Sequence, residues 1–99
     1  MQSTLTNNRD NCYICGAPAT CDHHLIFGTS GRAFADKYGL VIPICDSCHT
    51  FKGIHDNSIF ERMSKLLGQA IYERDRALEG MTQEDIRKRF IQERGESYL

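Results

Sequence analysis

The sequence lacks the features that mark exported, membrane-spanning or strongly basic proteins. Its first ten residues contain no basic segment followed by an apolar one, and no later segment approaches about 18 uninterrupted apolar residues. Its 12 basic and 13 acidic side chains give a formal net charge of −1, so no overall positive field attracts nucleic acid. These absences predict a cytoplasmic protein without a membrane partner, in which any contact with nucleic acid is local.

Proline is scarce, and no internal repeat or long linker is visible. The only two prolines, Pro18 and Pro43, lie in the first half, and the 99 residues fall below the rough prior of about 150 per domain. A core of this size is often supplemented by disulfides, a metal or a partner. We expect one domain with a flexible N-terminus over 1–10, a ligand-bearing core over 11–56 and a helical region over 57–99 that completes it.

Cysteine and histidine, by contrast, are abundant, and all 5 cysteines and 4 histidines precede residue 57. Cys12-x-x-Cys15 and Cys45-x-x-Cys48 form two pairs that can converge on Zn²⁺ at Zn–S distances of about 2.3 Å. Disulfides are the alternative, but the odd cysteine count and the missing export signal count against them. The remaining Cys21 is either a small buried strand residue, which we favour, or a ligand in a second site.

The second cysteine pair also matches another pattern. Residues 45–49 read Cys-Asp-Ser-Cys-His, which is the attachment motif of c-type haem. Haem attachment normally needs an exported chain and would leave Cys12 and Cys15 without a role. The zinc interpretation is therefore preferred.

The first half predicts two short strands separated by a helix. Apolar and β-branched residues favour strands over 20–27 and 40–44, the second confined by Pro43 to an edge or to its final residues. A helix over 31–38 would end at Gly39. The sequence thus predicts a small α+β fold.

The remaining elements are predicted to be helical. Asp46 can cap a short helix over 47–52 that Gly53 would stop. Ser58-Ile59-Phe60-Glu61 resembles a capping box that starts a long amphipathic helix reaching Gly80. Thr82 can cap a last helix ended by Gly95. We expect apolar stripes on the long helix (Phe60, Met63, Leu67, Ala70, Ile71 and Leu78) and on the last one (Ile86, Phe90 and Ile91) to be packing surfaces.

The histidines predict a second site. His23 and His24 are neighbours on a strand and point to opposite faces, so they share a site only at a strand end, a distortion or an edge. His49 follows a cysteine by one residue, or about 100° of helix, so one short helix can link two sites. Lys52, three positions on, falls on the same helical side as His49. A turn after Gly53 would either return His55 to this site or leave it in solvent.

Together these motifs resemble a known family. Cys12-x-x-Cys15, the run Asp-His-His-Leu-Ile-Phe-Gly over 22–28, and the segment from Tyr38 to Cys45-x-x-Cys48-His49 look like the zinc-braced HNH endonucleases, most of all their small phage forms. The resemblance covers about residues 11–56. It implies a ββα-metal core braced by zinc, with the C-terminal helices packed on it, in a bacterial or phage-infected host cell. It also implies metal-dependent hydrolysis of DNA phosphodiester bonds.

The resemblance assigns roles by position. His23 falls on the first metal ligand, His24 on the base that activates water, and His49 on the metal ligand from the helix. His55 is an additional candidate ligand. The family precedent is Mg²⁺ or Mn²⁺ at this site, and another divalent transition metal is the alternative because imidazoles suit softer ions.

Two further expectations concern partners. Arg32, Lys37 and Lys52 are candidate phosphate contacts or ordinary surface charges, and DNA binding is expected to be weak and sensitive to salt. Gly39-Leu40 stands where the family has its central Asn, so a catalytically degenerate zinc-binding module that binds DNA or protein is the alternative function. The C-terminal helices are a candidate surface for a partner protein, and the oligomeric state is left open.

Overall fold

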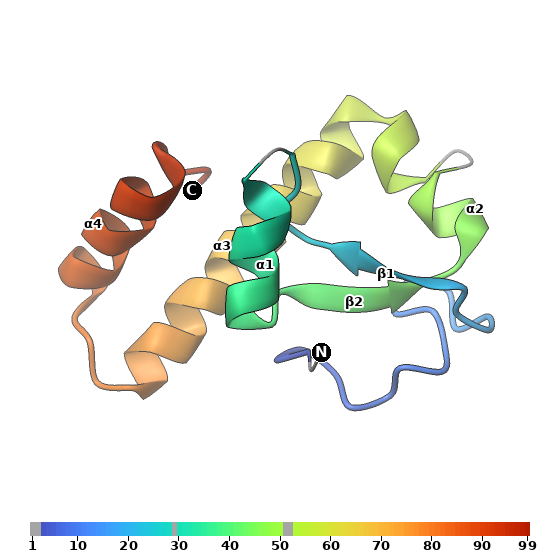
Figure 1. Ribbon diagram of the computed structural model, residues 1–99, viewed down its shortest axis with the longest axis horizontal. Helices are drawn as coiled ribbons and strands as arrows, with labels where there is room; N and C mark the ends of the chain where they lie inside the picture. Colours follow the sequence, from blue (N-terminus) through green and yellow to red (C-terminus); the bar gives the residue numbers. More distant parts are fainter. Residues whose placement is uncertain (1–2, 29, 51–52) are drawn as a thin grey trace.

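The computed structural model describes residues 3–28, 30–50 and 53–99 and has a mixed α+β architecture (Figure 1). The inserted helix α1 lies at one end of the two-stranded sheet and α2 at the other, and α4 lies at the end of the molecule away from α2. The α+β class is therefore confirmed. In chain order, the elements are β1 (Cys21–His24), α1 (Gly31–Tyr38), β2 (Val41–Ile44), α2 (Asp46–His49), the 3-10 turn η1 (Ile54–Asp56), α3 (Ser58–Leu78) and α4 (Gln83–Arg94).

The two strands pair antiparallel, with Cys21 opposite Ile44 and His24 opposite Val41. The predicted first strand over 20–27 is too long, because the chain leaves the sheet after His24. Leu25 and Ile26 turn into the core instead, where both side chains are buried. The strand that carries the paired histidines is thus short and ends beside α3.

Helix α1 occupies the connection between the strands, as predicted. It ends at Gly39, whose φ of 70° lies in the left-handed region that glycine adopts without strain. Phe34 on its inner face packs in an aromatic core, with its ring centroid 5.5 Å from those of both Tyr72 and Phe90. The insertion between the strands is therefore held against α3 and α4.

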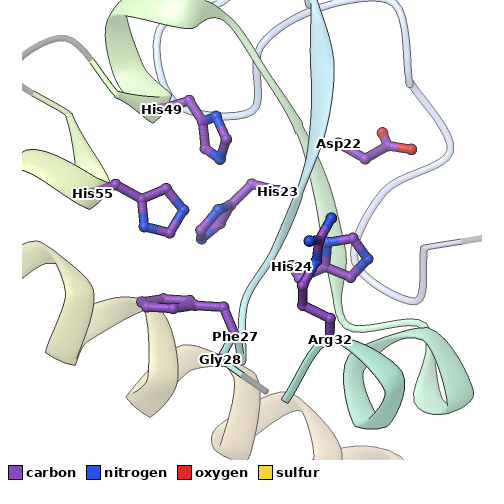
Figure 2. Close-up of a pocket in the computed structure, with 8 residues that line it drawn as sticks. All are labelled: Asp22, His23, His24, Phe27, Gly28, Arg32, His49 and His55. Carbon is purple, nitrogen blue, oxygen red and sulfur yellow. The ribbon is translucent and has the colours of Figure 1, made fainter. Parts of the chain in front are cut away.

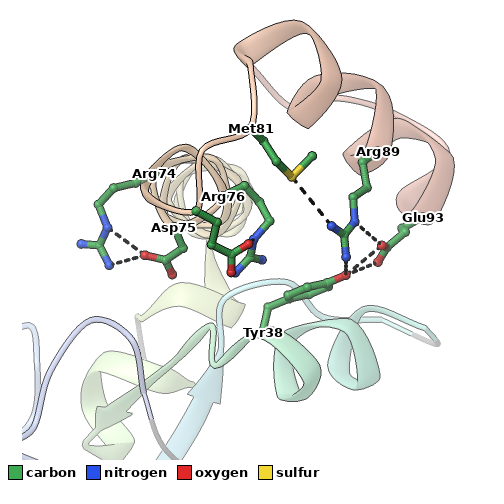
Figure 3. A network of polar contacts seen from close by, with 8 residues as sticks. Tyr38, Arg74, Asp75, Arg76, Met81, Arg89 and Glu93 are labelled. Carbon is green, nitrogen blue, oxygen red and sulfur yellow. Dashed lines mark hydrogen bonds and ion pairs between the residues drawn. The ribbon is translucent and has the colours of Figure 1, made fainter.

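Polar contacts also fasten α4 to α1 (Figure 3). The Tyr38 hydroxyl donates to Glu93 Oε1 at 2.8 Å, and Arg89 donates to the Tyr38 hydroxyl oxygen at 3.2 Å. Thr82 caps α4 by accepting from the backbone N–H of Asp85, and the helix ends before Gly95, as predicted. The C-terminal helix therefore packs on the inserted helix.

The predicted capping box of α3 is wrong. The N-cap is Asn57, whose side-chain Oδ1 accepts from the backbone N–H groups of Ile59 and Phe60. Ser58 is already the first helical residue. Asparagine and serine are about equally favourable N-cap residues, so the helix can begin one residue earlier, with Asn57 as its cap.

The predicted packing stripe of α3 is also largely wrong. Apart from Tyr72, the residues of α3 that face the core are small or polar, and Gly68 allows close approach: a Cβ there would lie 2.8 Å from Ile26 Cγ1. The residues buried on α3 are Ser64, Gly68, Gln69 and Tyr72, whereas Phe60, Met63, Leu67 and Leu78 are 45%, 57%, 38% and 80% exposed. On α4, Ile86 and Phe90 are buried as predicted, but Ile91 is 42% exposed.

Part of the segment expected to be flexible, residues 3–5, lies against the sheet. The Ser3 hydroxyl donates to the carbonyl oxygen of Val41 at 2.6 Å, and the Thr4 N–H donates to that of Gly39 at 3.0 Å. Over the described ranges, no helix combines the length and apolar character needed to cross a membrane.

Candidate functional site

The two cysteine pairs converge, as predicted. Cys12 and Cys15 lie in a turn that a hydrogen bond from the Tyr13 N–H to the Pro43 carbonyl holds against β2. Cys45 is the N-cap of α2, and Cys48 lies within that helix. The four sulfur atoms all lie within 4.8 Å of one another, and every cysteine of the chain is free of disulfides. This thiol cluster can hold a metal ion such as zinc.

The thiols in this cluster differ in acidity. Burial raises the pKa of Cys12, but backbone hydrogen bonds from Cys15, Cys45 and Ile14 outweigh burial and bring it down to about 6. Burial and the neighbouring thiols raise the pKa of Cys48 to about 12. A metal ion would replace these protons, because thiolates are the ligands that zinc binds.

Three histidines from three different elements form a second cluster (Figure 2). His23 comes from β1, His49 from the end of α2 and His55 from η1, and one nitrogen from each ring lies within 4.8 Å of the others. Their ring centroids are 4.7 to 5.2 Å apart. The Phe27 ring covers one side, 4.7 Å from that of His55. We call these three histidines the imidazole cluster.

The sequence left the direction of His55 open, and the structure returns it to the cluster. The return depends on Gly53, which is buried against the end of α2. A Cβ at this position would clash with the backbone carbonyl of Cys48. The close approach of the two backbones therefore requires glycine here.

His23 is the most enclosed member of the cluster, with 1% of its surface exposed. Burial, reinforced by the nearby His55 and His49, lowers its pKa to about 3. Its Nδ1 atom is buried and has no hydrogen-bond partner among the described residues. A buried nitrogen without a partner is costly, so it points to a ligand that the chain itself does not supply.

The other two members are more accessible. Burial and the proximity of His55 lower the pKa of His49, and Asp46 partly opposes this effect. His55 Nδ1 lies 3.9 Å from Glu61 Oε2. At neutral pH, His23 and His49 are therefore uncharged and able to offer lone pairs to a cation.

His24 lies on the other side of β1, as its position next to His23 predicts (Figure 2). Its Nε2 lies 2.7 Å from Asp36 Oδ1 on α1. Both sides of the strand nevertheless open to one cavity, because β1 is an edge strand and the cavity extends around it. The volume is about 460 Å³, and the lining residues are Asp22, His23, His24, Phe27, Gly28, Arg32, His49 and His55.

The three predicted phosphate contacts have different placements. Arg32 lies on α1, four residues before Asp36, and lines the cavity. Lys37 is exposed on the same helix, and its Nζ lies 5.2 Å from the centroid of the Tyr38 ring rather than at the cavity. Lys52 lies outside the described residues.

The expectation that Cys21 is buried is wrong. The sequence favours a buried strand residue, but Cys21 is exposed, with its Sγ atom 3.7 Å from His49 Nδ1. The side chain is exposed because a two-stranded sheet leaves the start of β1 uncovered. Cys21 is thus near the imidazole cluster but outside both groups of converging ligand atoms.

Helix α2 joins the two clusters. Cys48 faces the thiols and the next residue, His49, faces the imidazoles, as the rotation between consecutive helical residues predicts. Asp36 and Ser64, which contact His24 and His23, were not predicted. In the sequence, the only feature that could have placed Asp36 near the site was its i, i+4 spacing from the candidate phosphate contact Arg32. No feature of the sequence indicated Ser64.

The chain matches no protein-family model, no curated protein and no solved structure. Its chemistry must therefore be inferred from the two clusters and the cavity beside them.

Proposed function

We propose that the protein is a metal-dependent HNH endonuclease that hydrolyses DNA phosphodiester bonds. The observation that carries this proposal is the convergence of His23, His49 and His55 at a cavity that His24 and Arg32 also line. Hydrolysis of a phosphodiester needs a cation, a base for water and a contact for the anionic phosphate. In this proposal the three clustered histidines bind the cation, His24 is the base and Arg32 contacts the phosphate. The resemblance of residues 11–56 to HNH endonucleases supports the same function.

The donor sets fit two different ions. Four thiols are the donor set of structural zinc sites, so we assign Zn²⁺ to the thiol cluster. The imidazole cluster, with the unpartnered Nδ1 of His23, fits a divalent cation: Mg²⁺ or Mn²⁺ by family precedent, or Zn²⁺, Co²⁺ or Ni²⁺ by the softness of the nitrogen donors. A cation bound there would stabilise the negative charge that develops during phosphodiester cleavage.

The chain supplies the proton transfer through His24. The Asp36 carboxylate can only accept a hydrogen bond, so in the neutral form of His24, which a base requires, Nε2 carries the hydrogen and Nδ1 the lone pair. That lone pair takes a proton from the attacking water as its oxygen bonds to phosphorus and the bond to the leaving oxygen breaks.

Basic side chains hold the DNA in this proposal. Arg32, which lines the cavity, contacts the scissile phosphate, and Lys37 and Lys52 remain candidate contacts to other phosphates of the DNA. Because the net charge is −1, binding is weak and falls steeply with salt.

Cleavage of supercoiled plasmid tests the proposal. Wild-type protein is incubated with the plasmid and Mg²⁺ or Mn²⁺, then with Zn²⁺ or Co²⁺, beside His24→Ala, a chelator control and Lys88→Ala as a change of a distant exposed residue. We expect wild type and Lys88→Ala to nick the plasmid, and His24→Ala and the chelated sample to leave it intact. Equal nicking by His24→Ala would refute the assignment of the base.

One observation favours a second function. Gly39, at the place of the family's central Asn, is the left-handed cap of α1, so that position ends a helix here. A zinc-binding module that has lost catalysis and binds DNA or protein is consistent with this substitution. Salt-dependent binding of a labelled duplex without cleavage in any of the metals would support this alternative.

A further inference from the structure

Ser64 connects α3 to the imidazole cluster. Its side chain is 5% exposed, and its Oγ lies 2.8 Å from the Leu25 carbonyl oxygen and 2.9 Å from His23 Nε2. Gly68, one turn further along α3, allows the helix to lie this close to the end of β1. The hydroxyl therefore sits between a backbone carbonyl and a histidine ring.

The proton positions follow from the chemistry of the three groups. A serine hydroxyl has one hydrogen to donate, and the carbonyl oxygen of Leu25 can accept a hydrogen bond but cannot donate one. The Ser64 hydroxyl therefore donates to Leu25 and accepts from His23, so Nε2 of His23 carries the hydrogen. A second proton on Nδ1 would place a charge and an unpaired N–H in a side chain that is 1% exposed.

The lone pair of His23 is consequently on Nδ1. This atom is buried and has no partner in the part of the chain that the structure describes. It belongs to the side chain whose ring faces His49 and His55 (Figure 2). The opposite tautomer would present an N–H, which cannot bind a metal, to the cluster.

We propose that Ser64 is a positioning residue that fixes the tautomer of His23 and directs its Nδ1 lone pair to a divalent cation in the imidazole cluster. This role rests on the metal site of the proposed function. It makes α3, which lies outside the motif-bearing segment 11–56, part of the site. Loss of a partner that orients a metal-bound histidine typically weakens metal affinity by about 10- to 100-fold.

Metal titration is the first test. Protein loaded with one equivalent of Zn²⁺, to fill the thiol cluster, is titrated with Co²⁺ by calorimetry. We expect Ser64→Ala to raise the Kd for Co²⁺ by about 10- to 100-fold, and Ser64→Thr, which keeps the hydroxyl, to stay near wild type. Ser58→Ala, an exposed serine of the same helix, is the matched control and leaves the Kd unchanged.

The ring nitrogen signals of ¹⁵N-labelled histidine give a second readout that needs neither Co²⁺ nor DNA. In protein carrying zinc only at the thiol cluster, we expect a protonated Nε2 and an unprotonated Nδ1 for His23. Ser64→Ala should lose this preference while keeping its circular dichroism spectrum. This signature separates tautomer control from a purely structural role.

The outcomes distinguish the two proposals. A wild type that binds Co²⁺ together with an equally tight Ser64→Ala overturns the role of Ser64 and leaves the endonuclease proposal standing. A proton on Nδ1 of wild-type His23 also overturns the proposed role of Ser64. A wild type that binds no Co²⁺ beyond the thiol cluster overturns the metal site, and with it both proposals.

Discussion

In the proposed mechanism, a single contact at His24 decides which ring nitrogen takes the proton from water. The Asp36 carboxylate, 2.7 Å from Nε2, holds the ring in one tautomer and one orientation. We expect Asp36→Ala to lower the single-turnover rate of plasmid nicking by about 10- to 100-fold at saturating metal, because the ring is then free to turn and change tautomer. Asp36→Asn, which keeps an acceptor oxygen, should lose less.

Asp85→Ala, which removes an exposed acidic residue on α4, is the control for the loss of one negative charge. Asp36 belongs to neither cluster of converging ligands, so Asp36→Ala should keep the metal content of wild type. An unchanged nicking rate in Asp36→Ala would show that His24 is oriented by something else or is not the base.

The sequence predicted the residues of the clusters better than the contacts that orient them. The spacing of the cysteine pairs predicted the four thiols that converge, and His23 and His49 converge as expected, whereas the direction of His55 was left open and His24 lies outside the cluster. The partners Asp36 and Ser64 lie 12 and 41 residues from the histidines that they contact. Such partners depend on how α1 and α3 are placed, which short-range spacing does not encode.

At the scale of elements, Gly53 controls how η1 meets α2. A methyl group there would clash with the Cys48 carbonyl, so the turn that carries His55 would move away. We expect Gly53→Ala to destabilise the protein by about 1–3 kcal/mol and to weaken Co²⁺ binding at the imidazole cluster. Urea denaturation and calorimetric titration measure the two effects.

Gly80→Ala is the matched control, because it adds the same methyl group where no atom lies within 4 Å. Its φ of +98° makes the change strained, at about 1 kcal/mol, without affecting the histidines. If Gly53→Ala binds Co²⁺ as tightly as wild type, the backbone approach at Gly53 does not shape the cluster.

An ion pair between α3 and α4 makes stability depend on pH. The Glu73 side chain is 13% exposed and accepts from Arg87 Nε at 2.7 Å and from Gln69. Burial alone would raise the pKa of Glu73, but the hydrogen bonds from Arg87 and Gln69 outweigh it and hold the pKa below its ordinary value of 4.5. The unfolded chain therefore takes up this proton first as the solution is acidified.

The sign of the effect follows from this order. The stabilisation is fully present above pH 4.5 and is lost as the pH falls through the lowered pKa of the folded state. We expect Glu73→Gln to lower the free energy of unfolding by about 1–2 kcal/mol at pH 7 and by much less in strong acid. Glu84→Gln, in an exposed pair with Lys88, should change it little at either pH. Parallel losses for Glu73→Gln across the pH range would contradict the ion-pair explanation.

Helix α3 shows why element faces were harder to predict than element positions. Its existence follows from helical periodicity, but the apolar stripe with Phe60 and Met63 is exposed, whereas Ser64 and Gly68 are buried. Close backbone approach and a hydrogen bond to Leu25 outweigh apolar area on this face. Periodicity reports where apolar residues lie along a helix but not where a neighbouring backbone comes within contact.

At the scale of the whole molecule, the thiol and imidazole clusters are not independent. Helix α2 has only four residues, yet Cys45 caps it, Cys48 lies in it and His49 ends it. So short a helix is not stable on its own, and its geometry depends on what holds its ends. A metal in the thiol cluster would therefore fix the position of His49 in the other cluster.

Removing one thiol tests this dependence. We expect Cys45→Ser to lose one equivalent of bound zinc and several kcal/mol of stability, because binding free energy at a structural zinc site contributes to folding. It should also lose Co²⁺ binding at the imidazole cluster, although it changes no histidine. Cys21→Ser, which removes an exposed cysteine outside the thiol cluster, should keep both the zinc and the stability.

Elemental analysis, thermal melting and Co²⁺ titration of the two variants measure these effects. A Cys45→Ser protein that melts like wild type and keeps its zinc would refute the thiol site, whereas one that loses zinc but still binds Co²⁺ with wild-type affinity would show that α2 does not couple the clusters.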